Sequence, residues 1–71
     1  MAREYRGWTI AGHSFEEMGK WRPLITVSLE TRRAEILTRR LLTPSEWAFD
    51  SEQESDEGGY RLAVAWIDEG G

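Results

Sequence analysis

Residues 55–71, SDEGGYRLAVAWIDEGG, decide the fold because this stretch is compatible with either a helix or a strand. One stripe of a helix would carry Ser55, Gly59, Leu62, Ala63 and Trp66. A strand would use the alternation in YRLAVAWI, residues 60–67, and would run into a diglycine tail. Val64 falls off the helical stripe, and each internal glycine costs a helix about 1 kcal/mol relative to alanine. Alanine, however, is a weak strand former and occurs twice in the eight residues, so we expect the helix.

The residues before this stretch carry the start signal of a helix. Asp50 is followed three positions later by Gln53, which resembles a capping box, and four acidic residues follow between positions 52 and 57. Negative charge is favourable at that end of the helix dipole. The small residues at 55 and 59 would let the first turns approach a sheet closely, and Gly70 can end the helix.

The sequence before residue 44 predicts three strands. Residues 4–11 alternate with a period of two, and residues 12–20 lack a sustained period and predict a long hairpin connection. Residues 21–30, WRPLITVSLE, give the clearest strand pattern, with Pro23 near its start where proline is tolerated. A polar turn, TRRA, precedes further extended character in residues 35–43. Local connections between strands favour an antiparallel meander.

We therefore predict an α+β fold in which residues 1–71 form a single two-layer β-β-β-α domain. Three antiparallel strands would form the sheet, and the C-terminal helix would pack on one of its faces. The predicted core consists of Trp8, Trp21, Ile25, Val27, Phe49, Leu62 and Trp66.

Length and composition exclude several kinds of protein. With 71 residues, the chain is near the size at which many domains need a covalent staple, yet it contains no cysteine. Disulfides, thiolate zinc sites and redox motifs are therefore excluded. Four tryptophans either compensate for the small core or form a binding face, and we prefer the first interpretation. No apolar run approaches the roughly 18 residues of a membrane span, so we expect a soluble, cytoplasmic protein without membrane contact.

The net charge of −4 is unevenly distributed along the chain. Residues 1–43 hold eight basic and five acidic side chains, whereas residues 44–71 hold one basic and eight acidic ones. Such polarity can mark a nucleic-acid face or an asymmetric partner surface. It more often means that a basic element and an acidic element partly neutralise each other, and we favour that interpretation.

The segments YRGWTI, KWRPLITVSLE and WAF, followed by DSEQESDEGGYRLAVAWID, together resemble a class of small, largely uncharacterised bacterial proteins. In that class a three-stranded antiparallel meander precedes one C-terminal helix that ends in Trp-Ile-Asp or Ile-Ile-Asp. The chain departs from the class at Ser55 and Gly58, where the similar proteins more often carry alanine. The resemblance rests on apolar patterning, so it implies a fold and no activity.

No motif predicts catalysis, a metal site or a cofactor. His13 is the single histidine and neighbours Ser14, but a catalytic pair must meet in space and needs an orienting acid, for which Glu16 or Glu17 are the local candidates. We expect an ordinary loop histidine. The terminal Gly-Gly fits a ubiquitin-like sulfur carrier, but the tail of such a carrier follows a strand. We therefore rank a carrier third among the functions.

Our leading expectation is a noncatalytic interaction module that binds an unknown protein or a second copy of itself through the sheet face opposite the helix. The candidate surface comprises Tyr5, Arg22, Leu24, Thr26, Arg39 and Arg40, with further apolar residues between 36 and 42. The alternative is a nucleic-acid-binding accessory protein, in which an arginine patch and Tyr5 would contact phosphates and bases. The acidic net charge disfavours that alternative.

Overall fold

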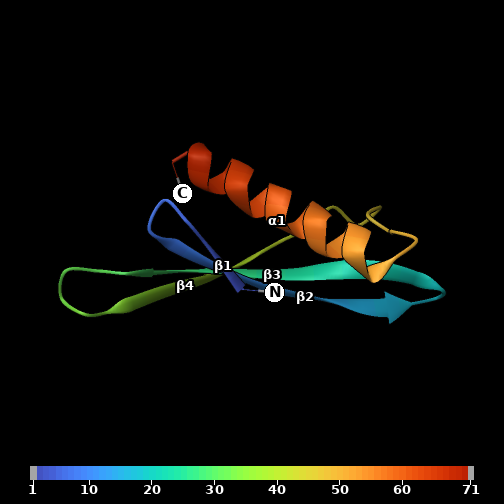
Figure 1. Cartoon of the computed structure of the whole chain (residues 1–71), viewed down its shortest axis with the longest axis horizontal. Coiled ribbons are helices and arrows are strands. Elements are labelled where there is room, and N and C mark those ends of the chain that lie inside the picture. Colours follow the sequence, from blue (N-terminus) through green and yellow to red (C-terminus); the bar gives the residue numbers. More distant parts are fainter. Residues whose placement is uncertain (1, 71) are drawn as a thin grey trace.

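The computed structural model describes residues 2–70 and contains, within them, a four-stranded antiparallel sheet and one helix (Figure 1). The elements in chain order are β1 (Ala2–Tyr5), β2 (Trp8–Glu17), β3 (Lys20–Glu30), β4 (Ile36–Leu41) and α1 (Glu52–Asp68). The strands lie in the same order in space as in sequence, and α1 lies across one face. The α+β meander with a C-terminal helix is confirmed, but the prediction of three strands is wrong.

The additional strand arises from a tight hairpin turn at Arg6 and Gly7, and a second tight turn, at Met18 and Gly19, shortens the predicted connection. Arg6 and Gly7 have φ values of 50° and 86°, and Met18 and Gly19 have φ values of 52° and 78°. Two consecutive residues with positive φ form the two-residue turn whose twist matches antiparallel strands. The predicted strand over residues 4–11 is therefore a hairpin of β1 and β2. The predicted connection over residues 12–20 is mostly strand, since β2 continues to Glu17.

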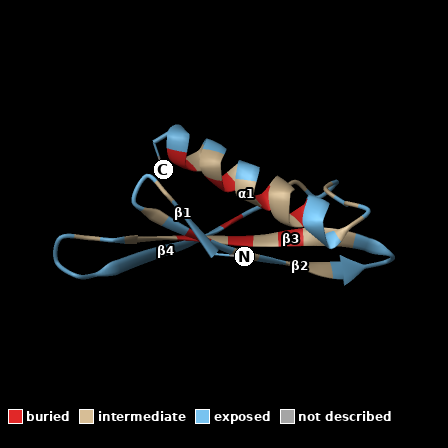
Figure 2. Ribbon diagram, in the orientation of Figure 1, coloured by how far each residue is buried: buried red, intermediate tan, exposed pale blue. Residues whose placement is uncertain are grey.

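The core lies between α1 and the face of β3 that carries alternate apolar residues. The fully or nearly buried apolar residues are Ile10, Ile25, Val27, Leu41, Ala63 and Ile67 (Figure 2). Ile10 lies directly opposite Val27, and Leu41 lies opposite Ile25, so the three longest strands contribute to one layer.

The predicted core residues divide into two groups. Ile25 and Val27 are buried, whereas Trp8, Trp21, Phe49, Leu62 and Trp66 are only half-buried. Trp21 and Phe49 are joined through their backbones, with N···O distances of 2.8 and 2.9 Å in the two directions. The aromatic residues therefore form the margins of the core rather than its centre.

The helix predicted for the C-terminal stretch is confirmed, and the alternative of a strand over residues 60–67 is wrong. Its buried positions, Ser55, Gly59, Ala63 and Ile67, recur every fourth residue. The N-cap is Ser51 rather than Asp50, and the Ser51 hydroxyl accepts a hydrogen bond from the Glu54 backbone N–H at 3.1 Å. At the other end Gly70 has a φ of 107° and donates its N–H to the Ile67 carbonyl, as the sequence predicts.

Asp50 instead pairs with Lys20 at the start of β3. The hydrogen bond and the charge of Lys20 lower the pKa of the Asp50 carboxyl, and the same contact with Asp50 raises the pKa of the Lys20 ammonium. Both side chains are solvent-exposed, so this pair positions the chain before α1 more than it stabilises the fold.

Gly59 allows α1 to lie directly on β3. A Cβ atom at this position would stand 2.5 Å from the Ile25 Cδ1 atom and 3.0 Å from the Pro23 Cβ atom. Ile25 is buried, so neither neighbour can move aside easily. Contact with the sheet therefore explains why this helix tolerates a residue of low helix propensity.

Ser55 is fully buried and satisfies its hydroxyl across the interface between helix and sheet. The Ser14 hydroxyl of β2 lies 2.7 Å from the Ser55 hydroxyl and 2.6 Å from the Asp56 Oδ1 atom. Since a hydroxyl donates once, the simplest arrangement has Ser55 donating to Ser14 and Ser14 donating to Asp56. This network gives a structural reason for serine, rather than alanine, at position 55.

Candidate functional site

The sheet face opposite α1 is not covered by any element within residues 2–70 (Figure 1). Its central positions carry a mixture of apolar side chains, small polar side chains and one histidine: Ala11, His13 and Phe15 on β2, and Leu24, Thr26 and Ser28 on β3. Cross-strand partners share a face, and Ala11 lies opposite Thr26 while Phe15 lies opposite Arg22. The centre of this open face is therefore flat, with charges toward its margins.

The charges on the open face are balanced. By the strand register its acidic members are Glu4, Glu17 and Glu30, and its basic members are Lys20, Arg22 and Arg40. Arg22 lies 3.5 Å from the Glu17 carboxylate and donates to the Ser45 carbonyl at 3.1 Å. A face with equal numbers of both signs can meet a copy of itself without net repulsion.

The register divides the predicted interaction surface between the two sides of the sheet. Arg22, Leu24, Thr26 and Arg40 lie on the open face. Tyr5 and Arg39 lie on the helix side, because Tyr5 is opposite Trp8 and Arg39 is opposite Val27.

The apolar residues predicted for the open face also divide. Ile36, opposite Glu30, lies on that face. Leu37 and Leu41 lie on the helix side, since Leu37 is opposite Leu29 and Leu41 is opposite Ile25, and Leu42 contributes to a hollow beside Leu62 of α1. The prediction that apolar residues between 36 and 42 lie on the open face therefore holds for Ile36, whereas it is wrong for Leu37 and Leu41.

The β1 edge of the sheet is tied to the helix by side chains. The Tyr5 hydroxyl donates to the Asp68 carboxylate at 2.8 Å, and Arg6 lies 3.5 Å from the same carboxylate. Arg3 forms an ion pair with Glu57 at 3.1 Å. The hydrogen bond to Asp68 is the largest of the effects that raise the pKa of the Tyr5 hydroxyl, and burial and the negative charge of Asp68 raise it further. Figure 1 shows the β1–β2 turn curling toward the C-terminal end of α1.

The β4 side of the sheet instead leaves a groove along α1. Two hollows of about 330 and 370 Å³ adjoin there, and both are lined by Arg39 and Trp66. Trp8 closes the floor of the groove by meeting Trp66 edge to face, with ring centroids 5.2 Å apart. Leu37 and Leu42 line the groove and remain 52% and 88% exposed.

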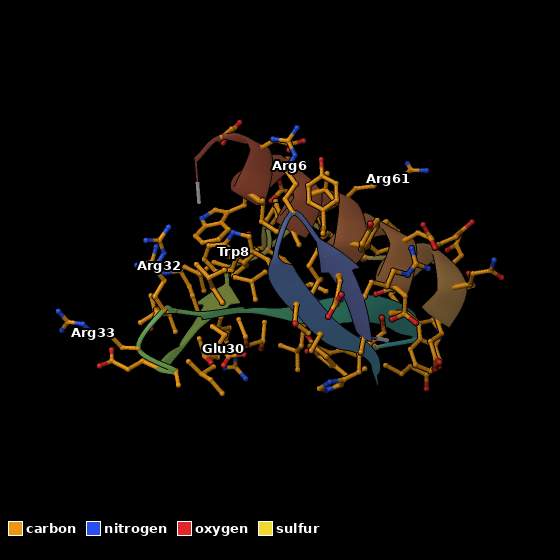
Figure 3. The ribbon with its side chains drawn as sticks, turned by 60° about the vertical axis from the view of Figure 1, so that its left-hand side comes forward. Arg6, Trp8, Glu30, Arg32, Arg33 and Arg61 are labelled. Atoms are coloured by element: carbon orange, nitrogen blue, oxygen red, sulfur yellow. The ribbon has the colours of Figure 1, made fainter. Side chains whose placement is uncertain are left out.

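The arginines of the chain do not gather into one patch. Arg32 and Arg33 project from the turn between β3 and β4, far from Arg6 and Arg61 (Figure 3). Arg39 and Arg40 point to opposite sides of β4. The arginine patch that nucleic-acid binding would require is thus spread over the hairpin tip and both faces, and this alternative stays a prediction.

The other sequence motifs are also placed by the structure. His13 lies in β2 rather than in the predicted loop, and it faces away from Ser14 because neighbouring strand residues point to opposite faces. Within residues 2–70, no group of three or more His, Cys, Asp or Glu side chains could hold a metal ion. The diglycine tail follows a helix, and Gly71 lies outside the described residues.

Comparisons of the chain with family models, with curated proteins and with solved structures found no match. Over the part of the chain that the structure describes, no helix combines the length and the apolar character needed to cross a membrane.

Proposed function

We propose that the chain is a noncatalytic interaction module whose open sheet face pairs with the same face of a second copy. The observation that carries this proposal is the combination of an uncovered, flat centre with balanced charges at the margins. Uncovered sheet faces that carry apolar side chains, here Ala11, Phe15 and Leu24, gain stability when they are buried against another surface. A face that carries both signs is also suited to a two-fold arrangement, in which each residue of one copy meets a different residue of the other.

The size of the face is sufficient for such an interface. β2 and β3 contain 10 and 11 residues. β1 and β4 add 4 and 6 residues, so at about 3.3 Å per residue and about 4.8 Å between strands the face measures on the order of 500 Å². Two copies would therefore bury about 1,000 Å², which is near the smallest area expected of a specific interface. We infer a dimer of moderate affinity.

The experiment is a measurement of molar mass by sedimentation equilibrium across a range of concentrations. The expected result is twice the single-chain mass of 8.2 kDa. Ala11→Arg, which inserts a long charged side chain at the centre of the open face, should return the mass to that of one chain. Ala65→Arg is the matched control, because Ala65 is exposed on α1. A monomer at millimolar concentration, or a dimer that persists in Ala11→Arg, would contradict the proposal.

A further inference from the structure

β4 ends the sheet and offers its outer backbone edge. Its residues, Ile36–Leu41, pair with β3 on one side, and β4 is the last strand in the sheet order. The outward N–H and C=O groups of an edge strand can accept a further strand from another chain. The edge is six residues long, which is enough for the usual length of an added strand.

The groove beside this edge provides pockets for the side chains of such a strand. A residue placed opposite Leu37 would point toward α1 and reach the hollow lined by Trp8, Leu37 and Trp66. The hollow of about 330 Å³ has room for a large apolar side chain. Backbone pairing and a side-chain pocket therefore lie next to each other.

The charge of this region indicates the chemistry of the added strand. The hairpin from residue 30 to residue 42 holds four arginines against two glutamates, in a chain whose net charge is −4. Among residues 2–70, Arg39 and Arg40 have no carboxylate within ion-pair distance, whereas Arg3, Arg6 and Arg22 each have one. Arg39 instead lies over the Trp66 ring, 5.8 Å from its centroid. An incoming carboxylate can therefore pair with Arg39 at the rim of the groove.

We propose that β4 and the adjoining groove bind an extended, acidic segment of a different protein, which adds to the sheet as a further strand. An apolar side chain of that segment occupies the hollow between Trp8 and Trp66, and an acidic one pairs with Arg39. A second copy is a poorer occupant, because pairing two β4 strands brings four arginines to one seam. The site uses the edge and the helix side of the sheet, so it is independent of self-association through the open face.

The test uses the full chain and an acetylated, amidated peptide, Leu-Glu-Glu-Thr-Phe-Val. Paired antiparallel to β4, this peptide places its phenylalanine opposite Leu37 and its second glutamate opposite Arg39. Titration followed by amide and indole NMR signals should shift residues 36–41 together with the Trp8 and Trp66 indole N–H groups. Arg39→Glu should weaken binding at least tenfold, and a peptide with lysines in place of the glutamates should bind Arg39→Glu better than the wild type.

Arg33→Glu is the matched control, since it makes the same charge change at the hairpin tip and should leave the affinity within about twofold. Ala11→Arg should also bind the peptide normally, which separates this proposal from self-association. Equal affinity for the acidic and the basic peptide would overturn the inference. So would shifts confined to the open face, tighter binding of a short RNA by the same residues, or loss of β4 edge signals in the chain alone through self-assembly.

Discussion

The two edge strands of the sheet, β1 and β4, differ in the side-chain contacts that they make with α1. At the β1 edge, Arg3, Tyr5 and Arg6 reach over to carboxylates of α1 and close the sheet against the helix. At the β4 edge no pair with a carboxylate of α1 exists within residues 2–70; Arg39 instead lies over the Trp66 ring, and exposed leucines stand beside a groove. The acidic side chains of α1 therefore pair with the β1 side of the sheet, and β4 is left as the side available to a partner.

The two ends of β4 give the largest contrast. Leu41 is 7% exposed and packs opposite Ile25, whereas Leu37 is 52% exposed. Leu41→Ala should reduce the free energy of unfolding by about 2–3 kcal/mol, in the lower part of the range for buried leucines. Leu37→Ala should change it by less than about 1 kcal/mol, because little burial is lost. Urea denaturation of both variants measures the difference. Equal losses would mean that the β4 edge is covered like the rest of the sheet.

The packing of α1 against β3 can be disrupted by a substitution at Gly59. Gly59→Ala should lower the free energy of unfolding by about 1–2 kcal/mol, because overpacking against Ile25 outweighs the gain in helix propensity. Adding Ile25→Val removes the Cδ1 atom and should recover part of that loss, with a coupling of about 0.5–1 kcal/mol. Thermal denaturation of the two single variants and the double variant measures the coupling.

Gly58→Ala is the matched control for this prediction. Its Cβ would approach the Phe49 ring, with 2.7 Å to the Cζ atom, but that ring is half-buried and can move outward. We expect a change within about 0.5 kcal/mol, since the helix gains propensity at the same time. If Gly59→Ala were as harmless as Gly58→Ala, the helix would not be seated on β3 as described.

The smallest expected effect concerns the closed β1 edge. The pKa of Tyr5 is raised in the folded state, so its contribution to stability is complete below the unfolded pKa of about 10 and is lost as the pH rises through the folded value. Asp68→Asn should move the Tyr5 pKa back toward its usual range, as followed by the NMR titration of the ring. Glu69→Gln, in the same turn, should leave it unchanged. An unaltered Tyr5 pKa in Asp68→Asn would show that β1 is not held by this contact.

Much of the fold could be predicted from two segments in which apolar residues recur with the period of a strand or of a helix. The alternation in residues 21–30 identified β3 and its covered face, and the spacing of residues 55–66 identified α1. The two hairpin turns were missed because arginine and methionine occupy positions that usually hold Asn, Asp or Gly. The N-cap was placed one residue early because Asp50 and Ser51 are both good caps.

The missed turn at Arg6 and Gly7 also explains the error at the candidate site. A continuous strand places Tyr5 and Trp8 on opposite faces, since they are three residues apart. A two-residue turn reverses the chain and brings the same two residues opposite each other on one face. Tyr5 was consequently assigned to the open face. The position of Arg39 could not be predicted either, because it depends on the register of β4 against β3.

The adjacent glycines of α1 have a further consequence, for the cooperativity of folding. A helix of 17 residues is marginal in water without tertiary contacts, and two internal glycines remove about 2 kcal/mol of its intrinsic preference. Detached from the sheet, residues 52–68 would therefore lose their helical conformation. The sheet in turn would expose Ile10, Ile25 and Val27 to water. Neither layer can persist alone, so the whole domain folds and unfolds as one unit in spite of the local connections between its strands.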